Sequence, residues 1–229
     1  MARDRVKQFY SALGGEELVD PTKFIPEIVD YLQKEREMIL RIIRRENYAG
    51  IMEVGCMDGR NMDIAAEAGV SYVGIDIVKR FIDNARINLR QINLNGVVAE
   101  CDVKNLSPVR DFLSLRHLAF FPFNSFGNID DPERALESVR ENNLDSLILT
   151  YKTDERSSNV RRDYLVNNSM KNLRKRVTKK GIVFQSPRGL SSYAYNFETM
   201  SRMASNAGYS NCTSIPLSEI GVAYFLKSQ

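Results

Sequence analysis

The chain has a single histidine, His117, and three cysteines that form no CxxC pair. Cys56, Cys101 and Cys212 are widely spaced and odd in number, which fits neither a disulfide framework nor a zinc site. We therefore expect no bound metal, and buried thiols in a reducing compartment. Chemistry that needs a histidine base is left with one candidate.

Long hydrophobic runs are also missing. The first 20 residues contain no apolar core of signal-peptide length, and nowhere do about 18 apolar residues follow one another without a charge. These absences predict a cytoplasmic protein without a membrane partner. The net charge of +3 is too small to imply a polyanionic partner, so arguments about nucleic acid depend on local patches.

Short apolar runs alternate with helical patterns through the middle of the 229 residues. The predicted strands are 50–54, 71–76, 96–100, 117–123 and 145–152, and the predicted helices between them are 60–68, 78–92 and 131–142. Alternating helices and strands that are apolar on both faces predict a parallel sheet covered on both sides. The expected architecture is a doubly wound α/β fold.

The two ends of the chain follow other patterns. Residues 25–47 have the period of an amphipathic helix, and a shorter helix over 5–13 is expected to stop at Gly14 and Gly15, so 1–47 form a helical cap of the same domain. After Thr153 we expect a helix, two strands around Lys179 to Gly181, a helix at 197–208 and a closing hairpin at 211–227. The expected sheet is seven-stranded and mostly parallel, with an antiparallel C-terminal hairpin strand.

The stretch EVGCMDGRN, residues 53–61, follows the first predicted strand. Ligands of open parallel sheets bind beyond the carboxyl ends of the strands, and Gly55 and Gly59 permit a tight turn there. A dinucleotide fingerprint would have glycines at 57 and 60, where this chain has Met57 and Arg60. The turn alone is also compatible with a loop that holds no ligand.

Two further strand ends carry acids. Asp76 stands 21 residues after Gly55, where a carboxylate can accept hydrogen bonds from both hydroxyls of a ribose. It could equally cap the helix that follows. Asp102 follows the third strand, where a carboxylate can accept a hydrogen bond from the exocyclic amine of adenine.

With these three strand ends the chain resembles the class I S-adenosylmethionine-dependent methyltransferases, over about residues 48–229. The family's turn is an acid followed by G-x-G-x-G, matched here by Glu53, Gly55 and Gly59, with Met57 departing from it. The resemblance implies a Rossmann-like domain that binds S-adenosyl-L-methionine. The residues expected at the cofactor are Tyr10, Glu53, Gly55, Cys56, Asp58, Gly59, Asp76, Ile77, Asp102, Val103 and Phe123.

The segment FNSFGNI, residues 123–129, looks like the corresponding turn of small-molecule N-methyltransferases acting on glycine and amino sugars. Methyl transfer is an in-line displacement, and a deprotonated amine needs no base, whereas an alcohol does better with one. His117 begins its strand at the end opposite the expected site, so N-methylation is favoured over O-methylation, with no catalytic residue assigned. The residues expected at the substrate are Asn128, Tyr151, Arg188, Tyr193 and Tyr195.

Two alternatives remain open. The run KNLRKRVTKK, residues 171–180, has six cations and could track the backbone of RNA, although cations also protect an exposed strand edge. Met57 motivates the other alternative, a non-catalytic partner protein with a methyltransferase fold. The near balance of charge argues against nucleic acid, and the sequence leaves open whether the chain forms a homodimer.

Overall fold

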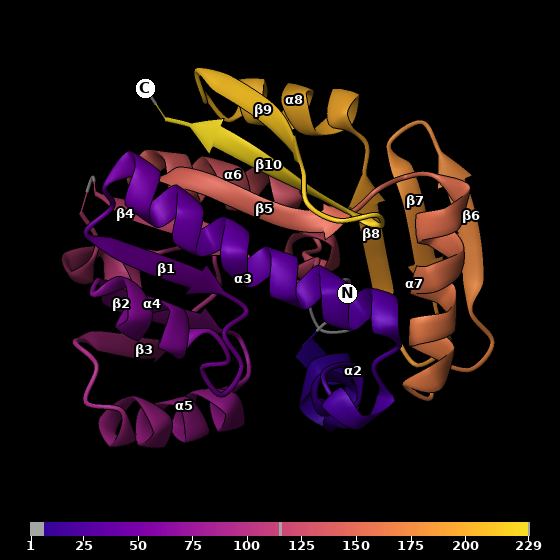
Figure 1. Ribbon diagram of the computed structural model, residues 1–229, viewed down its shortest axis with the longest axis horizontal. Helices are drawn as coiled ribbons and strands as arrows, with labels where there is room; N and C mark the ends of the chain where they lie inside the picture. The colour runs from indigo at the N-terminus through magenta and orange to yellow at the C-terminus, as the bar shows by residue number, and fades with distance from the viewer. Residues whose placement is uncertain (1–6, 115, 229) are drawn as a thin grey trace.

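A computed structural model describes residues 7–114 and 116–228, with residues 13 and 14 described by their backbone alone (Figure 1). The central sheet has seven strands in the order β3-β2-β1-β4-β5-β10-β9. β1 to β5 are parallel, and β10 is antiparallel to both β5 and β9. The strands are β1 (Gly50–Val54), β2 (Ser71–Asp76), β3 (Gly96–Glu100), β4 (His117–Phe121), β5 (Asp145–Tyr151), β9 (Asn211–Pro216) and β10 (Gly221–Lys227).

Helices cover both faces of this sheet. They are α3 (Pro26–Glu46), α4 (Met62–Ala68), α5 (Lys79–Gln91), α6 (Pro132–Glu141), α7 (Glu155–Asn167) and α8 (Phe197–Asn206). Buried residues of α3, α4 and α5 share one apolar cluster with one face of the strands, and residues of α6 and α8 share another with the opposite face. Successive residues such as Ile51 and Met52 belong to different clusters because side chains alternate across a strand. The predicted doubly wound fold is confirmed.

Sequence patterns located the parallel strands closely. β1, β2 and β3 begin and end at the predicted residues, whereas β4 ends at Phe121, two residues early. Pro122 has no N–H for the ladder, and Phe123 and Asn124 follow it with left-handed backbones, at φ of 44° and 60°. The chain therefore turns at the point where the pattern predicted more strand.

The N-terminal segment differs from the expected short helix. Residues 5 and 6 of that helix lie outside the described residues. From Tyr10 the chain forms a π-helical turn, η1 (Tyr10–Gly14), and continues into α2 (Gly15–Leu18), so the glycine pair does not end the helix. Gly15 has a helical φ of −68°, and a Cβ there would lie 2.9 Å from the ring of Phe81. Close packing on α5 explains this glycine.

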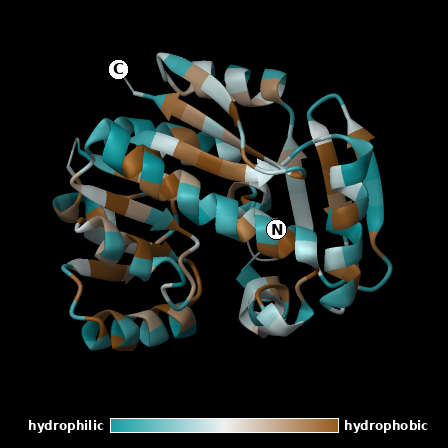
Figure 2. Cartoon of the chain, viewed as in Figure 1, coloured by the Kyte–Doolittle hydropathy of each residue, from teal (hydrophilic) through white to brown (hydrophobic). Residues whose placement is uncertain are grey.

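A second sheet was not predicted. The two strands predicted around Lys179 to Gly181 are present as β6 (Arg174–Thr178) and β7 (Gly181–Gln185), and with the unpredicted β8 (Ser191–Tyr195) they form a separate antiparallel sheet beside α7 (Figure 1). β7 is buried and hydrophobic, while the outer strand β6 is hydrophilic (Figure 2). Most of the basic run thus occupies an exposed edge strand and the loops beside it.

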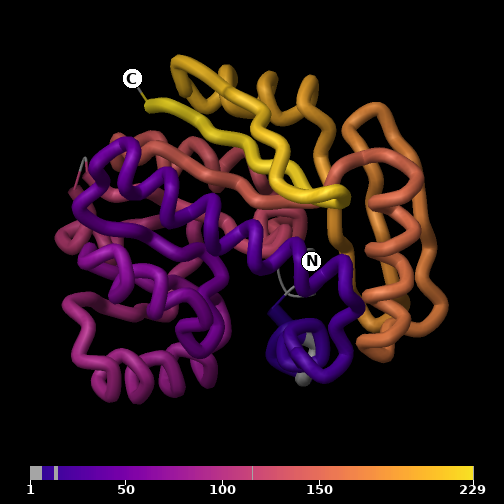
Figure 3. The backbone as a smooth tube through the Cα atoms, in the orientation of Figure 1, coloured from indigo at the N-terminus to yellow at the C-terminus, as the bar shows by residue number. Residues whose placement is uncertain are grey.

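The N-terminal segment lies beside elements from the other half of the chain (Figure 3). The Tyr164 hydroxyl of α7 donates a hydrogen bond to the Leu18 carbonyl, and Arg188 pairs with Glu17 at 2.7 Å. These contacts place residues 10–19 over the carboxyl ends of the parallel strands. Within the described ranges, no helix has the length and apolar character needed to cross a bilayer.

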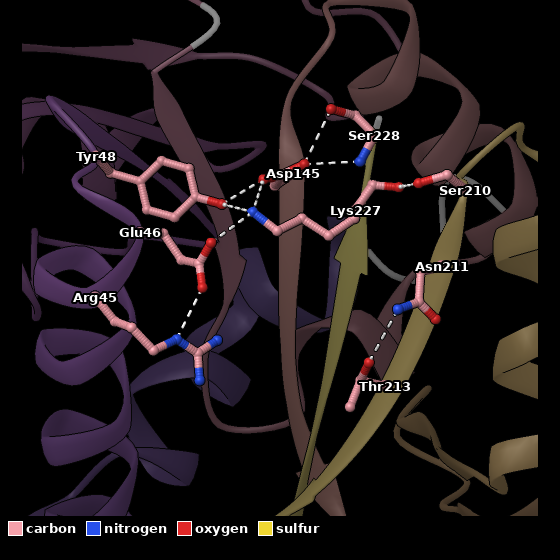
Figure 4. Close-up of polar contacts among 9 residues, drawn as sticks. All are labelled: Arg45, Glu46, Tyr48, Asp145, Ser210, Asn211, Thr213, Lys227 and Ser228. Carbon is pink, nitrogen blue, oxygen red and sulfur yellow. Dashed lines mark hydrogen bonds and ion pairs between the residues drawn. The ribbon is translucent and has the colours of Figure 1, made fainter.

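A polar cluster fastens the C-terminus at the opposite end of the strands (Figure 4). Lys227 Nζ lies 2.9 Å from carboxylate oxygens of both Glu46 and Asp145, and the Ser228 N–H donates to Asp145 at 2.7 Å. These groups come from β10, the end of α3 and the start of β5. The cluster therefore stabilises the closing strand far from the strand ends that carry the motifs.

Candidate functional site

One cavity lies at the carboxyl ends of the parallel strands. It is walled by the turns after β1 to β4, by residues 10–19, and by α7 and β8. The structure brings most of the sequence-predicted site residues to this cavity: Tyr10, Glu53, Gly55, Asp76, Ile77, Asp102, Val103, Phe123, Asn128 and Tyr151. The ends of adjacent parallel strands thus form one continuous binding surface.

The turn after β1 has a left-handed backbone at three positions. The φ angles are 80° at Gly55, 49° at Met57 and 90° at Gly59. Met57 therefore adopts the conformation that glycine favours, at the position where the family motif has glycine. Its N–H donates to Asp76 Oδ2 at 3.1 Å, and Met57 is among the residues that line the cavity. The departure changes the side chain and leaves the path of the turn intact.

Asp76 is buried, with 8% of its surface exposed. Oδ2 accepts from Met57, and Oδ1 accepts from the Val78 N–H at 2.9 Å. Burial raises the pKa of this carboxyl to about 6, against the opposing effect of the two N–H donors. The N-cap residue of α5 is Val78, so Asp76 orients the chain before the helix instead of capping it. Each carboxylate oxygen has a further lone pair for a ligand.

Asp102 stands two residues beyond the end of β3. Its Oδ1 accepts from the Lys104 N–H at 3.0 Å, and Lys104 Nζ lies 3.5 Å from its Oδ2. Val103 is buried beside it and lines the same cavity. The carboxylate and the apolar side chain together provide a polar edge and an apolar face, as a purine ring requires.

Glu53 connects the strand to the helix after the turn. Tyr72 and Asn61 each donate a side-chain hydrogen bond to it at 2.6 Å, one to each carboxylate oxygen. The carboxyl is 1% exposed, and burial raises its pKa to about 7. Because Asn61 precedes α4 directly, Glu53 fixes the distance between β1 and that helix.

Sequence reasoning missed the wall on the β5 side. Arg161 and Tyr164 of α7 and Ser192 of β8 line the cavity together with Tyr151, and the Arg161 guanidinium lies 5.1 Å from the centre of the Tyr151 ring. Arg161 is 2% exposed and lies on the buried face of α7, four residues after Ser157 and three before Tyr164. The signal was an arginine on the apolar face of a helix, but that helix has too few apolar residues for its face to be recognised.

Several predicted residues lie away from the cavity lining. Cys56 is buried behind the turn, Asp58 is exposed, and Gly59 packs on Met62. Arg188 pairs with Glu17 instead of facing the cavity. Tyr193 and Tyr195 stack on each other with ring centroids 5.1 Å apart, and Tyr195 packs on Phe126. None of these residues is among those that line the cavity.

His117 lies at the start of β4, far from the cavity. Its ring nitrogens contact Ser71 at 3.1 Å and Ser114 at 2.7 Å, and burial lowers its pKa. The imidazole therefore joins the amino ends of the strands to the preceding loop. This position agrees with the structural role expected from the sequence.

The fold agrees with the resemblance to class I methyltransferases. Residues 52–141 match a protein-family model described as a methyltransferase domain, which contains the turn after β1, Asp76 and Asp102. This match, over about two fifths of the chain, and the fold support a class I S-adenosylmethionine-dependent methyltransferase with S-adenosyl-L-methionine as its cofactor. A search of curated proteins finds no match.

Three solved structures illustrate the likeness. A Pyrococcus horikoshii OT3 protein has a TM-score of 0.66 at 12% identity, covering 92% of this chain and 97% of its own. Magnesium protoporphyrin IX methyltransferase from Synechocystis PCC 6803, with bound S-adenosylhomocysteine, has 0.63 at 8% identity, covering 98% and 99%. The Burkholderia thailandensis 1,6-didemethyltoxoflavin-N1-methyltransferase has 0.57 at 11% identity, covering 84% and 77%. At these identities the likeness shows the fold.

Proposed function

We propose that this chain transfers a methyl group from S-adenosyl-L-methionine to a small-molecule acceptor, with a nitrogen acceptor favoured over oxygen. The observation that carries the proposal is the single cavity that extends from Asp76 and Asp102 to Tyr151 and Arg161. This cavity connects the expected cofactor residues to a polar wall, formed by Tyr151 and Arg161, that the cofactor motifs do not include. Tyr10 and Leu18 wall it on the N-terminal side, which favours a small acceptor over a polymer.

Each of the expected cofactor residues would contact a different part of S-adenosyl-L-methionine. Asp76 would accept hydrogen bonds from the ribose hydroxyls, Asp102 would accept one from the adenine amine, and the turn at Gly55 would let the backbone approach the methionyl group. The bound cofactor would supply an electrophilic methyl group. Phe123, which follows β4, would then lie between the cofactor and the acceptor wall.

The charges in the cavity favour an amine acceptor. Glu53 is held by Tyr72 and Asn61, Asp76 by two N–H groups, and Asp130 by Lys104. Glu53 and Asp130 are thus hydrogen-bonded to groups of the chain, and Asp76 is expected to bind the ribose, so we assign none of the three the role of taking a proton from the acceptor. A neutral amine needs only alignment with the methyl carbon and exclusion of water, and the enclosed wall would provide both.

We also propose that residues 1–47 are a cap of one domain with residues 48–229. Tyr10, Gly15 and Leu18 line the same cavity as the strand ends. Ile28 and Tyr31 of α3 are fully buried in the main apolar cluster. Removal of the cap would therefore expose core residues and open the cavity together.

Calorimetric titration with S-adenosylhomocysteine tests the cofactor site. We expect one site per chain, and no detectable binding at millimolar ligand would exclude the proposed activity and favour a non-catalytic partner protein. A methyl-transfer assay with paired amines and alcohols of the same skeleton tests the acceptor atom. Faster transfer to the alcohols would contradict the preference for nitrogen.

The basic run gives the RNA alternative its own test. Lys175 and Arg176 lie on the exposed strand β6, and no residue of the run 171–180 lines the cavity. An RNA acceptor would bind with a strong salt dependence that disappears when these cations are neutralised. Binding to RNA that is independent of salt, or no binding, would leave the small-molecule proposal standing.

A further inference from the structure

Arg161 is a buried cation without an anionic partner. Its side chain is among the largest fully buried ones, and within residues 7–114 and 116–228 no carboxylate forms an ion pair with it. Burial lowers its pKa to about 10, which still leaves the guanidinium charged at neutral pH. Buried charges are normally paired, because their desolvation costs several kcal/mol. This charge needs a partner that the described chain does not supply.

Hydrogen bonds from two of its nitrogens hold the guanidinium, which also lies 5.2 Å from the centre of the Phe184 ring. Nη2 donates to the Ser192 carbonyl at 2.6 Å and to its hydroxyl at 2.8 Å, and Nη1 donates to the Ile182 carbonyl at 3.4 Å. A guanidinium has five N–H groups, so donors remain for a ligand. The Ser192 hydroxyl also accepts from Asn124 at 3.0 Å, which connects this position to the turn after β4.

An unpartnered hydroxyl faces the same part of the cavity. Tyr151 is 3% exposed, and its hydroxyl has no hydrogen-bond partner. The Arg161 guanidinium lies 5.1 Å from the centre of the Tyr151 ring, and both residues line the cavity. A buried hydroxyl without a partner costs about 1–3 kcal/mol, which a bound ligand would recover.

The order of the strands places this pair beyond the cofactor. Asp102 follows β3 and Tyr151 ends β5, and these strands are separated by β2, β1 and β4. Four strand spacings correspond to about 19 Å. The adenosyl end of the ligand belongs to β2 and β3, so β5 and α7 lie on the far side of the turn at Gly55. A second cation, Arg60, lines the cavity at that turn, closer to the expected methionyl group.

We propose that Arg161 and the Tyr151 hydroxyl form a subsite that binds a carboxylate of the methyl acceptor. This inference rests on the proposed function and narrows its substrate class to anionic small molecules. A carboxylate fits better than a phosphate because one negative charge balances one buried guanidinium. The carboxylate would accept N–H hydrogen bonds from Arg161 and one O–H hydrogen bond from Tyr151, which fixes the acceptor atom toward the methyl group.

Acetate is the probe for this subsite, because it carries the carboxylate and little else. The full chain, saturated with S-adenosylhomocysteine, is heated in sodium acetate and in sodium chloride of equal ionic strength. Acetate should raise the midpoint of unfolding by about 2–4 °C relative to chloride. Arg161→Gln should abolish the shift, and Tyr151→Phe, which only removes a hydroxyl, should reduce it. Arg162→Gln is the matched control, because Arg162 is exposed and pairs with Asp163.

A second experiment distinguishes whether Arg161 binds a carboxylate of the acceptor or the carboxylate of the cofactor. The measurement is repeated with 5′-methylthioadenosine, which lacks the amino-acid group. An acetate shift with both ligands supports the subsite. A shift with 5′-methylthioadenosine that disappears with S-adenosylhomocysteine would overturn it, because Arg161 would then hold the cofactor's carboxylate.

Other outcomes also decide the question. Equal midpoints in acetate and chloride for the unmodified chain, or a full shift retained in Tyr151→Phe, would overturn the subsite. If Arg161→Gln fails to fold, Tyr151→Phe still decides. Failure to bind S-adenosylhomocysteine would instead contradict the proposed function, so the two failures are distinguishable.

Discussion

The N–H of Phe123 donates a hydrogen bond to Oε2 of Glu35 at 2.6 Å, across 88 residues of sequence. Glu35 belongs to α3 and is 4% exposed, and Phe123 begins the turn after β4. The long N-terminal helix therefore holds the turn after β4, which lies between the strand ends that carry Asp76 and Asp102 and the end of β5. Burial raises the pKa of Glu35 to about 8, although the Phe123 N–H and the charge of Arg60 oppose the shift.

This pKa predicts a pH dependence of stability. The folded chain holds a proton on Glu35 that the unfolded chain releases near pH 4.5, so the stabilisation from this proton is lost between about pH 4.5 and 8. In that window the free energy of unfolding should fall with rising pH by up to about 1.4 kcal/mol per pH unit from this group. Urea titrations at several pH values give the free energy of unfolding as a function of pH. The fall of this free energy with pH should be smaller in Glu35→Gln, by the amount that one proton contributes. An identical slope in both proteins would contradict the raised pKa.

Replacing Asp76 tests the ribose contact. Asp76→Ala removes the charged acceptor and should weaken S-adenosylhomocysteine binding by about 1.5–3 kcal/mol, measured by calorimetry. Because burial raises the pKa of Asp76 to about 6, affinity of the unmodified chain should also decline below that pH. Asp58→Ala is the control, since Asp58 is exposed beside the same turn and does not line the cavity. Equal losses in both variants would refute the assignment.

Met57 provides a test of the turn. Met57→Gly fits the φ of 49° without strain and preserves the N–H that donates to Asp76, so binding of S-adenosylhomocysteine should persist. Met57→Val forces a β-branched residue into the left-handed region and should be less stable than Met57→Gly by roughly 1–2 kcal/mol. Chemical denaturation compares the two variants. Comparable stabilities would show that the turn relaxes away from this conformation.

Asn124 joins the two sides of the cavity through hydrogen bonds with Thr150 and Ser192. Asn124→Ala removes both bonds and leaves an alanine at φ of 60°. The free energy of unfolding should therefore fall by about 3 kcal/mol. Asn124→Gly removes the same bonds without the backbone strain and should recover roughly 1 kcal/mol of that loss. Denaturation midpoints at a constant m value check both figures, and a glycine variant less stable than the alanine variant would contradict the strain argument.

Sequence patterns predicted the central sheet because its strands are apolar on both faces and its helices have one apolar stripe. They predicted that Asp76 and Asp102 lie at one edge of the sheet because each follows the carboxyl end of a strand, and both line the cavity there. The wall on the β5 side has no such local signal: Arg161 is recognisable only once β7 and β8 bury it. Arg188 failed to reach the cavity for a related reason, because its partner Glu17 is 171 residues away in sequence.

The second sheet was missed because β8, with the sequence SSYAY, contains two serines and is too short for a hydrophobic pattern. The N-terminal glycines were interpreted as a helix end, although Gly15 is helical and packs closely on the ring of Phe81 from a distant helix. In each case the deciding contact joins residues far apart in the chain.

The cavity wall on the β5 side is built from a single stretch of the sequence. Tyr151, Arg161, Tyr164, Leu190 and Ser192 all come from one stretch of the chain, residues 151–192, whereas Asp76, Asp102 and the glycine turn come from residues before 104. Under the proposed function, changes within that stretch would alter which acceptor is bound while the proposed cofactor site keeps its geometry. A chimera that exchanges it with the matching segment of a relative is the most direct way to transplant acceptor preference.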